Sequence, residues 1–501
     1  MTSLSQTQGR KQPRKYSPDI LGALVFSGLC IFFAFLLPDT LCEIDPDEGI
    51  NVIKALLMDR GHLLYSDIYS DQPPFFHSLL VSWFRLFDFS LTAGRLLAVL
   101  LAATLVTALF LTVRLQRGAW WAFAAVVLLL FSNYFLLYAR AVMIGLPSLC
   151  FAMGAVFCLQ VYKQGDDRRI FHLLAAAVLM AMAFLTKMAV AVLLPAIILD
   201  LIRSEWQGRP RSLGDVGKLL RPVGIWFAAL LAGILLLTLL LAPQLFDASN
   251  FQQLFGTHRI LSRAIVSQRW QAVLTFIAKD RDLVVLAGIG IVPMLLRKKY
   301  DFIFPLGWVL VACAAFASHH PVWMHHYLYI SIPLAWLAAL TCSEMVAAFG
   351  RQRHHAGGTG LITGAGAALV LLWYLALVPA KVDRIKTQLA WSARLDLKTV
   401  QLMKSYAADT KWVVTDRPVY PFLAGLSVPP KVAYISRKRI LSEKTGADLL
   451  RQAIMEYEPR QILFSRFDWL NAALQPLLAE QYTKVHEQGR VRLYVRNNSV
   501  R

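Results

Sequence analysis

The chain of 501 residues is far more apolar than a soluble domain. Hydrophobic residues make up 57% of it and charged residues only 16%, against about a quarter charged in soluble proteins. This composition excludes an ordinary cytosolic globular protein and a nucleic-acid-binding protein, because the apolar residues form long runs that suit a lipid bilayer. The formal net charge of +20 is expected where basic loops face the cytoplasm.

Eleven apolar runs approach the roughly twenty residues that a helix needs to cross a bilayer. The first run follows a basic N-terminus and precedes no small-residue cleavage site, so we expect a retained helix with its N-terminus in the cytoplasm. The predicted spans are 20–37, 91–113, 119–137, 141–161, 170–185, 188–202, 222–241, 283–296, 302–317, 327–348 and 361–378.

The charges of the loops agree with this count. The loops assigned to the cytoplasm are basic, as in 114–117, 203–221 and 297–299, whereas the opposite loops hold most of the loop carboxylates and histidines. The runs on either side of Lys187 are kept separate, because merging them would reverse every later loop. We therefore expect a multi-pass protein of the inner or plasma membrane, with residues 39–90 outside the cytoplasm.

The final segment, 381–501, differs in composition from the apolar part. It shows strand-like runs at 412–416, 432–435, 461–464 and 491–495, and helical patterns at 448–457 and 470–481. We expect a small extracytoplasmic α/β domain that follows a membrane domain of residues 1–380. It shows no catalytic constellation of its own, and we expect it to cap the membrane domain or to contact an acceptor.

The first outer loop combines acidic residues with helical patterns. Asp47 and Glu48 precede a predicted amphipathic helix over 50–59, and Pro73 and Pro74 begin a second one. Carboxylates at the boundary of water and lipid can take a proton from a hydroxyl group. The alternative is a solvated loop whose acids only enforce the topology.

Three cations lie on the outer side, where the topology rule disfavours them: Lys187, Arg140 and Arg259. Such cations opposite carboxylates suit a lipid-linked phosphate, whose charge must be neutralised as it leaves. Each could instead pair with a neighbouring acid or a lipid headgroup. Four histidines within 319–326 lie on the same side, and their spacing favours hydrogen bonding to phosphate over a closed zinc site.

These motifs together resemble the GT-C membrane glycosyltransferases of the protein O-mannosyltransferase and aminoarabinose-transferase type, also called family 39. The resemblance implies a GT-C fold with about eleven transmembrane helices and juxtamembrane helices in the first outer loop. The residues that carry it are Asp47-Glu48, Gly61 and Tyr65 before Asp71-Gln72-Pro73-Pro74, Tyr138-Ala139-Arg140, Leu185-Thr186-Lys187, His258-Arg259, and His326-Tyr327 before Pro333.

The resemblance implies transfer of a hexose or pentose from a polyprenyl-phosphate donor to an acceptor hydroxyl on the outer face, with inversion. Asp47 would be the general base and Glu48 its helper. No cofactor is required by this chemistry, although Asp71 and His258 match candidate ligands of a divalent metal. The residues implied to contact the donor and its phosphate are Lys187, Arg140, Arg259, His326, Tyr327 and Tyr65.

The chain departs from this pattern at two places. Gln72 stands where the aminoarabinose transferases have a lysine, which removes a phosphate contact from this loop, and no carboxylate lies within 144–147. The implied partners are the donor, membrane lipids and a glycolipid, polysaccharide or protein acceptor, with undecaprenyl phosphate as the expected carrier in a bacterium.

Two other functions compete with this interpretation. A flippase or other transporter usually carries ionisable residues near the bilayer midplane and an internal repeat, neither of which we find in the sequence. A ligase or polymerase for lipid-linked glycans would share an outer-facing site, but the Asp-Glu pair after the first helix favours the glycosyltransferase.

Overall fold

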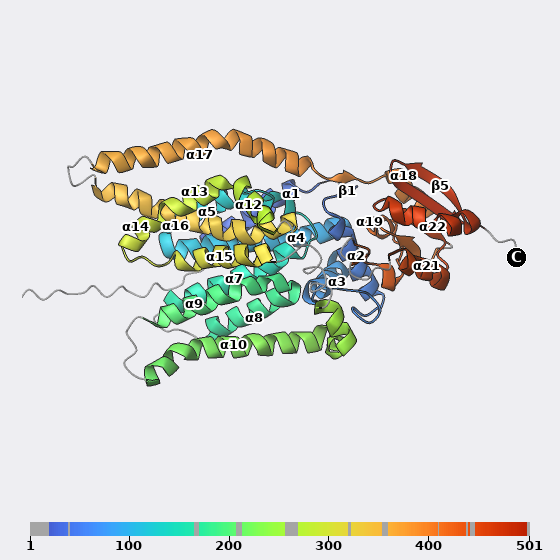
Figure 1. Cartoon of the computed structure of the whole chain (residues 1–501), viewed down its shortest axis with the longest axis horizontal. Helices are drawn as coiled ribbons and strands as arrows, with labels where there is room; N and C mark the ends of the chain where they lie inside the picture. The colour runs from blue at the N-terminus through green and yellow to red at the C-terminus, as the bar shows by residue number, and fades with distance from the viewer. Residues whose placement is uncertain are drawn as a thin grey trace, which may run out of the picture.

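The computed structural model describes residues 20–38, 41–164, 170–206, 213–255, 269–318, 322–352, 359–408, 410–436, 439–440 and 446–497. It shows a bundle of helices joined at one end to a small α/β domain (Figure 1). Helix α17 runs along the outside of the bundle and leads directly into that domain.

Each of the eleven predicted apolar runs forms helix, in one or two pieces. The prediction that the chain breaks at Lys187 is confirmed, because α8 ends at Thr186 and a 3-10 helix begins at Met188. The helices of the bundle are α1 (Ile20–Phe35), α4 (Leu91–Arg117), α5 (Ala119–Leu130), α6 (Phe135–Tyr138), α7 (Gly145–Gln164), α8 (Ile170–Thr186), η1 (Met188–Leu193), α9 (Leu194–Glu205), α10 (Leu213–Leu241), η2 (Pro243–Phe246), α12 (Arg269–Lys279), α13 (Arg281–Ile289), α14 (Ile291–Leu296), α15 (Ile303–Ser318), η3 (Met324–Tyr327), α16 (Leu328–Gln352) and α17 (Thr359–Ala390).

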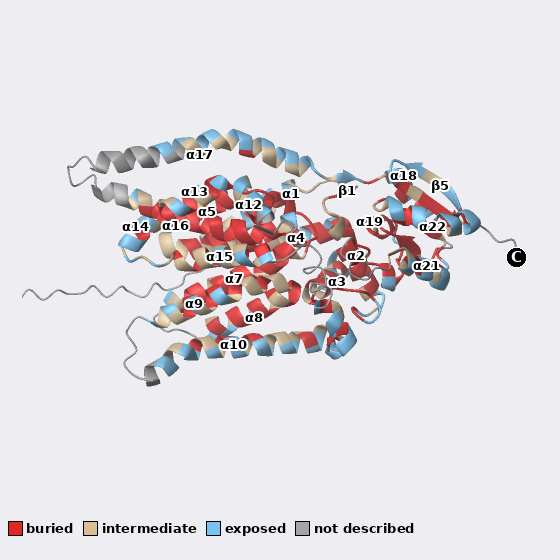
Figure 2. Cartoon of the chain, in the orientation of Figure 1, coloured by how far each residue is buried: buried red, intermediate tan, exposed pale blue. Residues whose placement is uncertain are grey.

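Four helical stretches of the described chain are long and apolar enough to cross a bilayer: Leu91–Arg117, Gly145–Gln164, Leu219–Leu241 and Met324–Ala347. Several shorter apolar helices accompany them, so the count of eleven spans stays a prediction. Leu219–Leu241, in α10, is mostly exposed, whereas the other three are mostly buried (Figure 2). An exposed face that consists of leucines suits contact with lipid chains rather than water.

Basic residues from several loops meet at the end of the bundle opposite the α/β domain. Arg297 and Lys299 both pair with the buried Glu344 near the end of α16, and Arg117 at the end of α4 pairs with Asp301. The loops that we assigned to one side by their charge therefore lie together.

Two helices of the first loop lie between the bundle and the α/β domain. The predicted helices are confirmed as α2 (Pro46–Asp59) and α3 (Phe75–Phe87). Helix α2 begins earlier than expected because Asp45 caps it: its side chain accepts a hydrogen bond from the Asp47 amide at 3.0 Å. Pro46 follows in the first turn, where its missing N–H costs nothing.

The α/β domain contains a four-stranded sheet in the order β3-β4-β6-β5, with β3 and β4 parallel and the other pairs antiparallel. The predicted strand at 432–435 is wrong, because the proline pair 429–430 starts a 3-10 turn instead. The elements are α18 (Leu397–Ser405), β3 (Val413–Thr415), α19 (Val419–Leu423), η4 (Pro430–Val432), α21 (Gly446–Tyr457), β4 (Gln461–Phe464), α22 (Asp468–Gln481), β5 (Tyr482–Gln488) and β6 (Val491–Arg496).

The α/β domain packs closely on the first loop. Strand β1 (Cys42–Glu43) pairs with β2 (Ala393–Arg394), and α19 packs on α2 at Gly49. A Cβ atom at Gly49 would lie only 2.7 Å from the Val419 amide nitrogen, so glycine permits this approach. Helix α17 continues across residue 381, and the domain boundary at 380/381 stays a prediction.

Candidate active site

A cavity of about 800 Å³ lies where the bundle, the first loop and the α/β domain meet. Acidic residues line it from the first loop, whereas cations line it from the bundle and the α/β domain. Its charged and polar lining residues are Glu43, Asp45, Asp47, Asp71, Gln72, Tyr138, Lys187, His325, His326, Arg417, Tyr434, Ser436, Ser465, Arg466 and Arg490.

Asp47 lies in the first turn of α2 and faces this cavity. Burial raises the pKa of its carboxyl group above the ordinary value, and the neighbouring Asp71 raises it further. The charges of Arg466 and Lys187 act in the opposite direction. A carboxylate with a raised pKa holds a proton more readily, and this property suits a general base.

Lys187 reaches the cavity from the break between α8 and η1. Its Nζ lies near the start of α7, since a Cβ at Gly145 would be 3.7 Å from it and 3.8 Å from the His325 ring. His326 also lines the cavity; its ring stacks on Phe316, and its Nδ1 accepts a hydrogen bond from the Trp323 amide at 3.2 Å. The structure therefore brings two predicted donor contacts, Lys187 and His326, to the cavity that holds Asp47.

Arginines of the α/β domain form the remaining wall. Arg417 and Arg466 follow closely on the parallel strands β3 and β4, so they lie at the same edge of the sheet. Arg417 donates from Nε to Glu43 at 2.7 Å, and this ion pair joins the domain to the first loop. These arginines are not among the predicted site residues, although each comes soon after a strand-like run.

Tyr434 and Lys54 join the α/β domain to the Asp71 loop. The Tyr434 hydroxyl lies 3.5 Å from the Asp71 carboxylate, and its ring stacks on Tyr69. Lys54 of α2 lies 4.6 Å from the centre of the Tyr434 ring and donates to Ser70 at 3.2 Å. A lysine thus reaches this loop from α2, although Gln72 replaces the lysine within the loop.

Residues 71–232 match the family described as dolichyl-phosphate-mannose-protein mannosyltransferase. No curated protein matches the chain. ArnT from Cupriavidus metallidurans bound to undecaprenyl phosphate is similar in structure, with a TM-score of 0.61 and 13% identity over 95% of this chain and 98% of that one. The apo oligosaccharyltransferase of Archaeoglobus fulgidus is similar with a TM-score of 0.56 and 12% identity, over 96% of this chain and 74% of that one.

The chain has the GT-C glycosyltransferase fold. The predicted fold class is therefore confirmed as a helical membrane protein with a small C-terminal sheet domain. Because the similar structures are below 25% identical to this chain, they support the fold and leave the roles of single residues to its own geometry.

Glu48 is not among the residues that line the cavity. Its carboxylate is fully buried, contacts Arg95 at 2.9 Å and 3.1 Å, and accepts from the amides of Ile44 and Val142. These contacts connect the start of α2 to α4 and to the segment before α7. Their geometry suits a residue that holds the Asp47 turn in place.

Three predicted donor contacts lie outside the lining of the GT-C cavity. Arg140 donates to the carbonyl oxygens of Leu36 and Leu389 at 2.8 Å and 2.6 Å. The Tyr65 hydroxyl donates to the Gln72 carbonyl at 2.8 Å and so supports the Asp71 loop. The Tyr327 hydroxyl donates to Asp280 at 2.7 Å, away from Asp47.

The other predicted contacts of the site can be placed only in part. Arg259 and His258 lie outside the described residues, as do His319 and His320. Within the described residues, no three His, Cys, Asp or Glu side chains form a group that could hold a metal ion. Asp71 lines the cavity, but its predicted partner His258 cannot be placed, so the divalent metal stays a prediction.

Proposed function

We propose that the chain transfers a sugar from a polyprenyl-phosphate donor to an acceptor hydroxyl, with inversion at the anomeric carbon. The observation that carries this proposal is that Asp47, from α2, and Lys187, from the break between α8 and η1, line the same cavity. The GT-C fold supports it, as does the match of residues 71–232 to a family described as using a dolichyl-phosphate sugar.

Asp47 is the general base of the proposed reaction. Its carboxylate accepts the proton of the acceptor hydroxyl while that oxygen attacks the anomeric carbon. The bond between the anomeric carbon and the phosphate oxygen breaks, and the lipid phosphate leaves with the bonding electrons. No acid is needed to protonate it, because a phosphate is already a good leaving group.

Lys187 neutralises the leaving phosphate in this scheme. Its ammonium group is a point charge that reaches the cavity from a helix end, where it can contact the phosphate of a lipid carrier. His326 lines the same part of the cavity and can donate a hydrogen bond to a phosphate oxygen from Nε2 while Nδ1 accepts from Trp323.

Glu48, Arg95 and Tyr65 position the reacting groups without contacting substrate. The buried Glu48–Arg95 pair fixes the first turn of α2, and the Tyr65 hydroxyl fixes the loop of Asp71. Asp71 and His258 are the proposed ligands of a divalent metal if one binds, and such an ion would supply further positive charge. We propose that the site faces the outer side of the inner or plasma membrane.

The test is transfer of labelled sugar by the purified full chain in detergent, with a panel of polyprenyl-phosphate sugars and membrane extract as acceptor. Asp47→Asn keeps the size of the side chain and removes the base, so we expect transfer to fall by roughly 10²- to 10⁴-fold. Donor binding should persist in this variant. Asp59→Asn, at the other end of α2, is the matched control.

Equal transfer by the wild-type chain and the Asp47→Asn variant would contradict the role of Asp47. Absence of transfer with every donor, together with movement of labelled lipid between leaflets of a vesicle, would instead indicate a flippase. Transfer of whole glycans between lipid carriers would indicate a ligase or polymerase.

A further inference from the structure

Ser465 and Arg466 lie on a loop that a single buried carboxylate holds in place. Asp416, directly after β3, accepts hydrogen bonds from the amides of Ser465, Arg466 and Phe467 at 2.9, 2.9 and 2.7 Å. Asp416 is completely buried, and the loop follows the parallel neighbour strand β4. Three backbone bonds to one carboxylate fix the direction in which the two side chains leave the sheet.

The hydroxyl of Ser465 lacks a partner in the part of the chain that the structure describes. Ser465 is only 8% exposed, its Oγ is buried without a hydrogen bond to any described residue, and the residue lines the cavity. A buried hydroxyl usually has a partner, because leaving it unpaired costs free energy. A bound molecule in the cavity would supply that partner.

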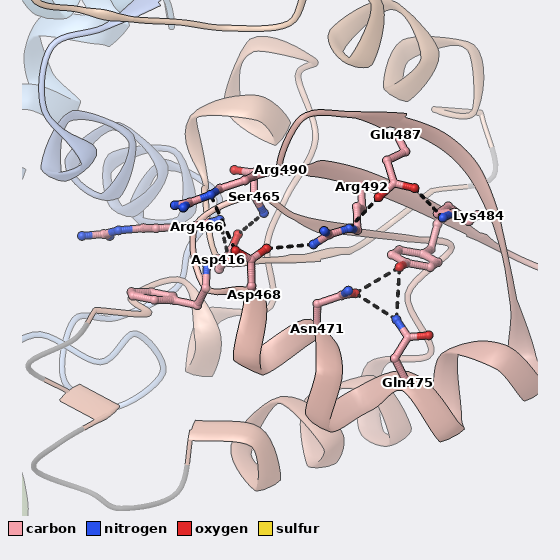
Figure 3. A network of polar contacts seen from close by, with 12 residues as sticks. Asp416, Ser465, Arg466, Asp468, Asn471, Gln475, Lys484, Glu487, Arg490 and Arg492 are labelled. Atoms are coloured by element: carbon pink, nitrogen blue, oxygen red, sulfur yellow. Dashed lines mark hydrogen bonds and ion pairs between the residues drawn. The ribbon is translucent and has the colours of Figure 1, made fainter.

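Two arginines beside Ser465 have guanidinium groups with little internal pairing. Arg466 forms no ion pair within 4.0 Å with the described residues, and its guanidinium carbon lies 5.0 Å from the centre of the Phe467 ring. Arg490 contacts Asp468 only at 3.6 Å, with its side chain 75% exposed. Figure 3 shows both side chains pointing to the same side, away from the sheet. Arg492, by contrast, is tightly paired with Asp468 and Glu487 at 2.9 and 2.8 Å.

We propose that Ser465, Arg466 and Arg490 form a subsite for an oxyanion, a phosphate or a carboxylate, that the acceptor carries near its reacting hydroxyl. A hydroxyl donor next to two guanidinium groups matches the geometry and charge of such a group. The proposal rests on the proposed glycosyl transfer, and it adds the chemical class of the acceptor.

The position of the subsite assigns it to the acceptor rather than to the donor. Lys187, the proposed contact of the donor phosphate, comes from the helical bundle, whereas Ser465 and Arg466 come from the α/β domain. In an inverting displacement the nucleophile and the leaving group lie on opposite faces of the anomeric carbon. We therefore assign the cations that the α/β domain adds to the cavity to the molecule that brings the nucleophile.

The first experiment measures binding, by calorimetry, of glucose, glucose 6-phosphate and glucuronate to the full chain in detergent. We expect the two anions to bind at least about 10-fold more tightly than glucose. High salt should weaken the binding of the anions, because it screens the charges. Arg466→Ala and Ser465→Ala should remove most of this preference, whereas Arg466→Lys should retain part of it. Arg451→Ala, an exposed arginine of the same domain outside the cavity, is the control.

The variant Lys187→Met separates this subsite from the donor site. If the Lys187→Met variant still binds the two anions more tightly than glucose, and the Arg466→Ala variant does not, the subsite is confirmed. If the tighter binding of anions is lost only in Lys187→Met, the anion binds in the donor site and the proposal is overturned. If Arg466→Ala does not fold, Arg490→Ala replaces it, because its side chain is exposed.

The second experiment compares transfer to the same three acceptors, so that the two proposals can fail separately. Arg466→Ala should lower kcat/KM for the anionic acceptors by about 10-fold relative to glucose. An equal decrease for all three would overturn the acceptor subsite and leave glycosyl transfer intact. Anion binding that depends on Arg466, without transfer from any donor, would keep an anion site and overturn the proposed function.

Discussion

Two groups of carboxylates in this chain are satisfied in opposite ways. Asp280, between α12 and α13, accepts from the Asn133 amide and the Tyr327 hydroxyl, both at 2.7 Å, and pairs with Lys381 and Arg384 of α17. Asp47 instead faces a cavity of about 800 Å³ together with other acids.

The comparison teaches that burial of charge does not by itself identify a site. Asp280 is paired with cations and hydrogen-bond donors of the protein itself, and these contacts join α17 to the bundle. Asp47 and Lys187 instead line a cavity that a ligand can enter, although Glu43 in the same lining is paired with Arg417 at 2.7 Å.

The largest effect should follow from breaking the closed cluster. Asp280→Ala removes the acceptor of the buried Asn133 amide and Tyr327 hydroxyl. It also removes one of the two carboxylates that pair with the buried Lys381, and loss of a partner from such a buried network costs about 3–5 kcal/mol of unfolding free energy. Thermal unfolding in detergent measures the loss. Asp383→Ala is the control and should change stability little, because Asp383 is an exposed acid on α17, the helix that carries Lys381. Equal melting temperatures for the two variants would contradict a structural role of the cluster.

A smaller effect on stability and a large one on activity should follow at the open cluster. Lys187→Met removes the cation that we propose neutralises the leaving phosphate, so we expect sugar transfer to fall by roughly 10²- to 10³-fold. Thermal unfolding should change far less than in Asp280→Ala. Lys279→Met, which removes a cation packed on Tyr134 outside the cavity, serves as the control. Transfer at the wild-type rate by Lys187→Met would exclude this residue from donor binding.

The helices of the fold could be predicted because apolar runs and loop charges are local signals. The break at Lys187 was found from the sign of the later loops alone. Strand β5 (Tyr482–Gln488) was missed because it is polar and largely exposed at the edge of the sheet. The false strand at 432–435 had a strand-like composition, but the proline pair before it favoured a turn.

The site could be predicted only where its residues lie at helix ends. Asp47 and Lys187, which the structure brings to one cavity, could be named as candidates because acids and cations on the outer side of a membrane helix are conspicuous. Arg466 is more than 400 residues from Asp47, and only packing of the α/β domain on α2 brings both to one cavity. Glu48 follows Asp47 directly, yet the helix turns it toward Arg95, and the sequence alone does not show this direction.

A third prediction tests whether the open cavity depends on docking of the α/β domain. Gly49→Ala places a Cβ atom 2.7 Å from the Val419 amide nitrogen, and such overpacking typically costs about 1–3 kcal/mol. We expect a lower melting temperature, faster proteolysis after α17 and reduced transfer. Gly28→Ala in α1 is the control, because its Cβ would meet nothing within 4 Å. Unchanged proteolysis would show that α2 and α19 can separate or shift without cost.

The smallest effect concerns the response of the open cluster to pH. Burial and the neighbouring Asp47 raise the pKa of Asp45 from 3.8 to about 7, so the folded chain holds this proton more tightly than the unfolded chain. The contribution of Asp45 to stability is therefore present at low pH and is lost as the pH rises from about 4 to 7.

Asp45→Asn can still cap α2 and carries no charge, so it should flatten this part of the profile. Thermal unfolding between pH 4 and 8 measures the difference. Asp280→Asn removes the ion pairs to Lys381 and Arg384, so it should lower stability at every pH in this range. A wild-type profile that rises between pH 4 and 7, and rises equally in Asp45→Asn, would contradict the repulsion among the acids of the cavity.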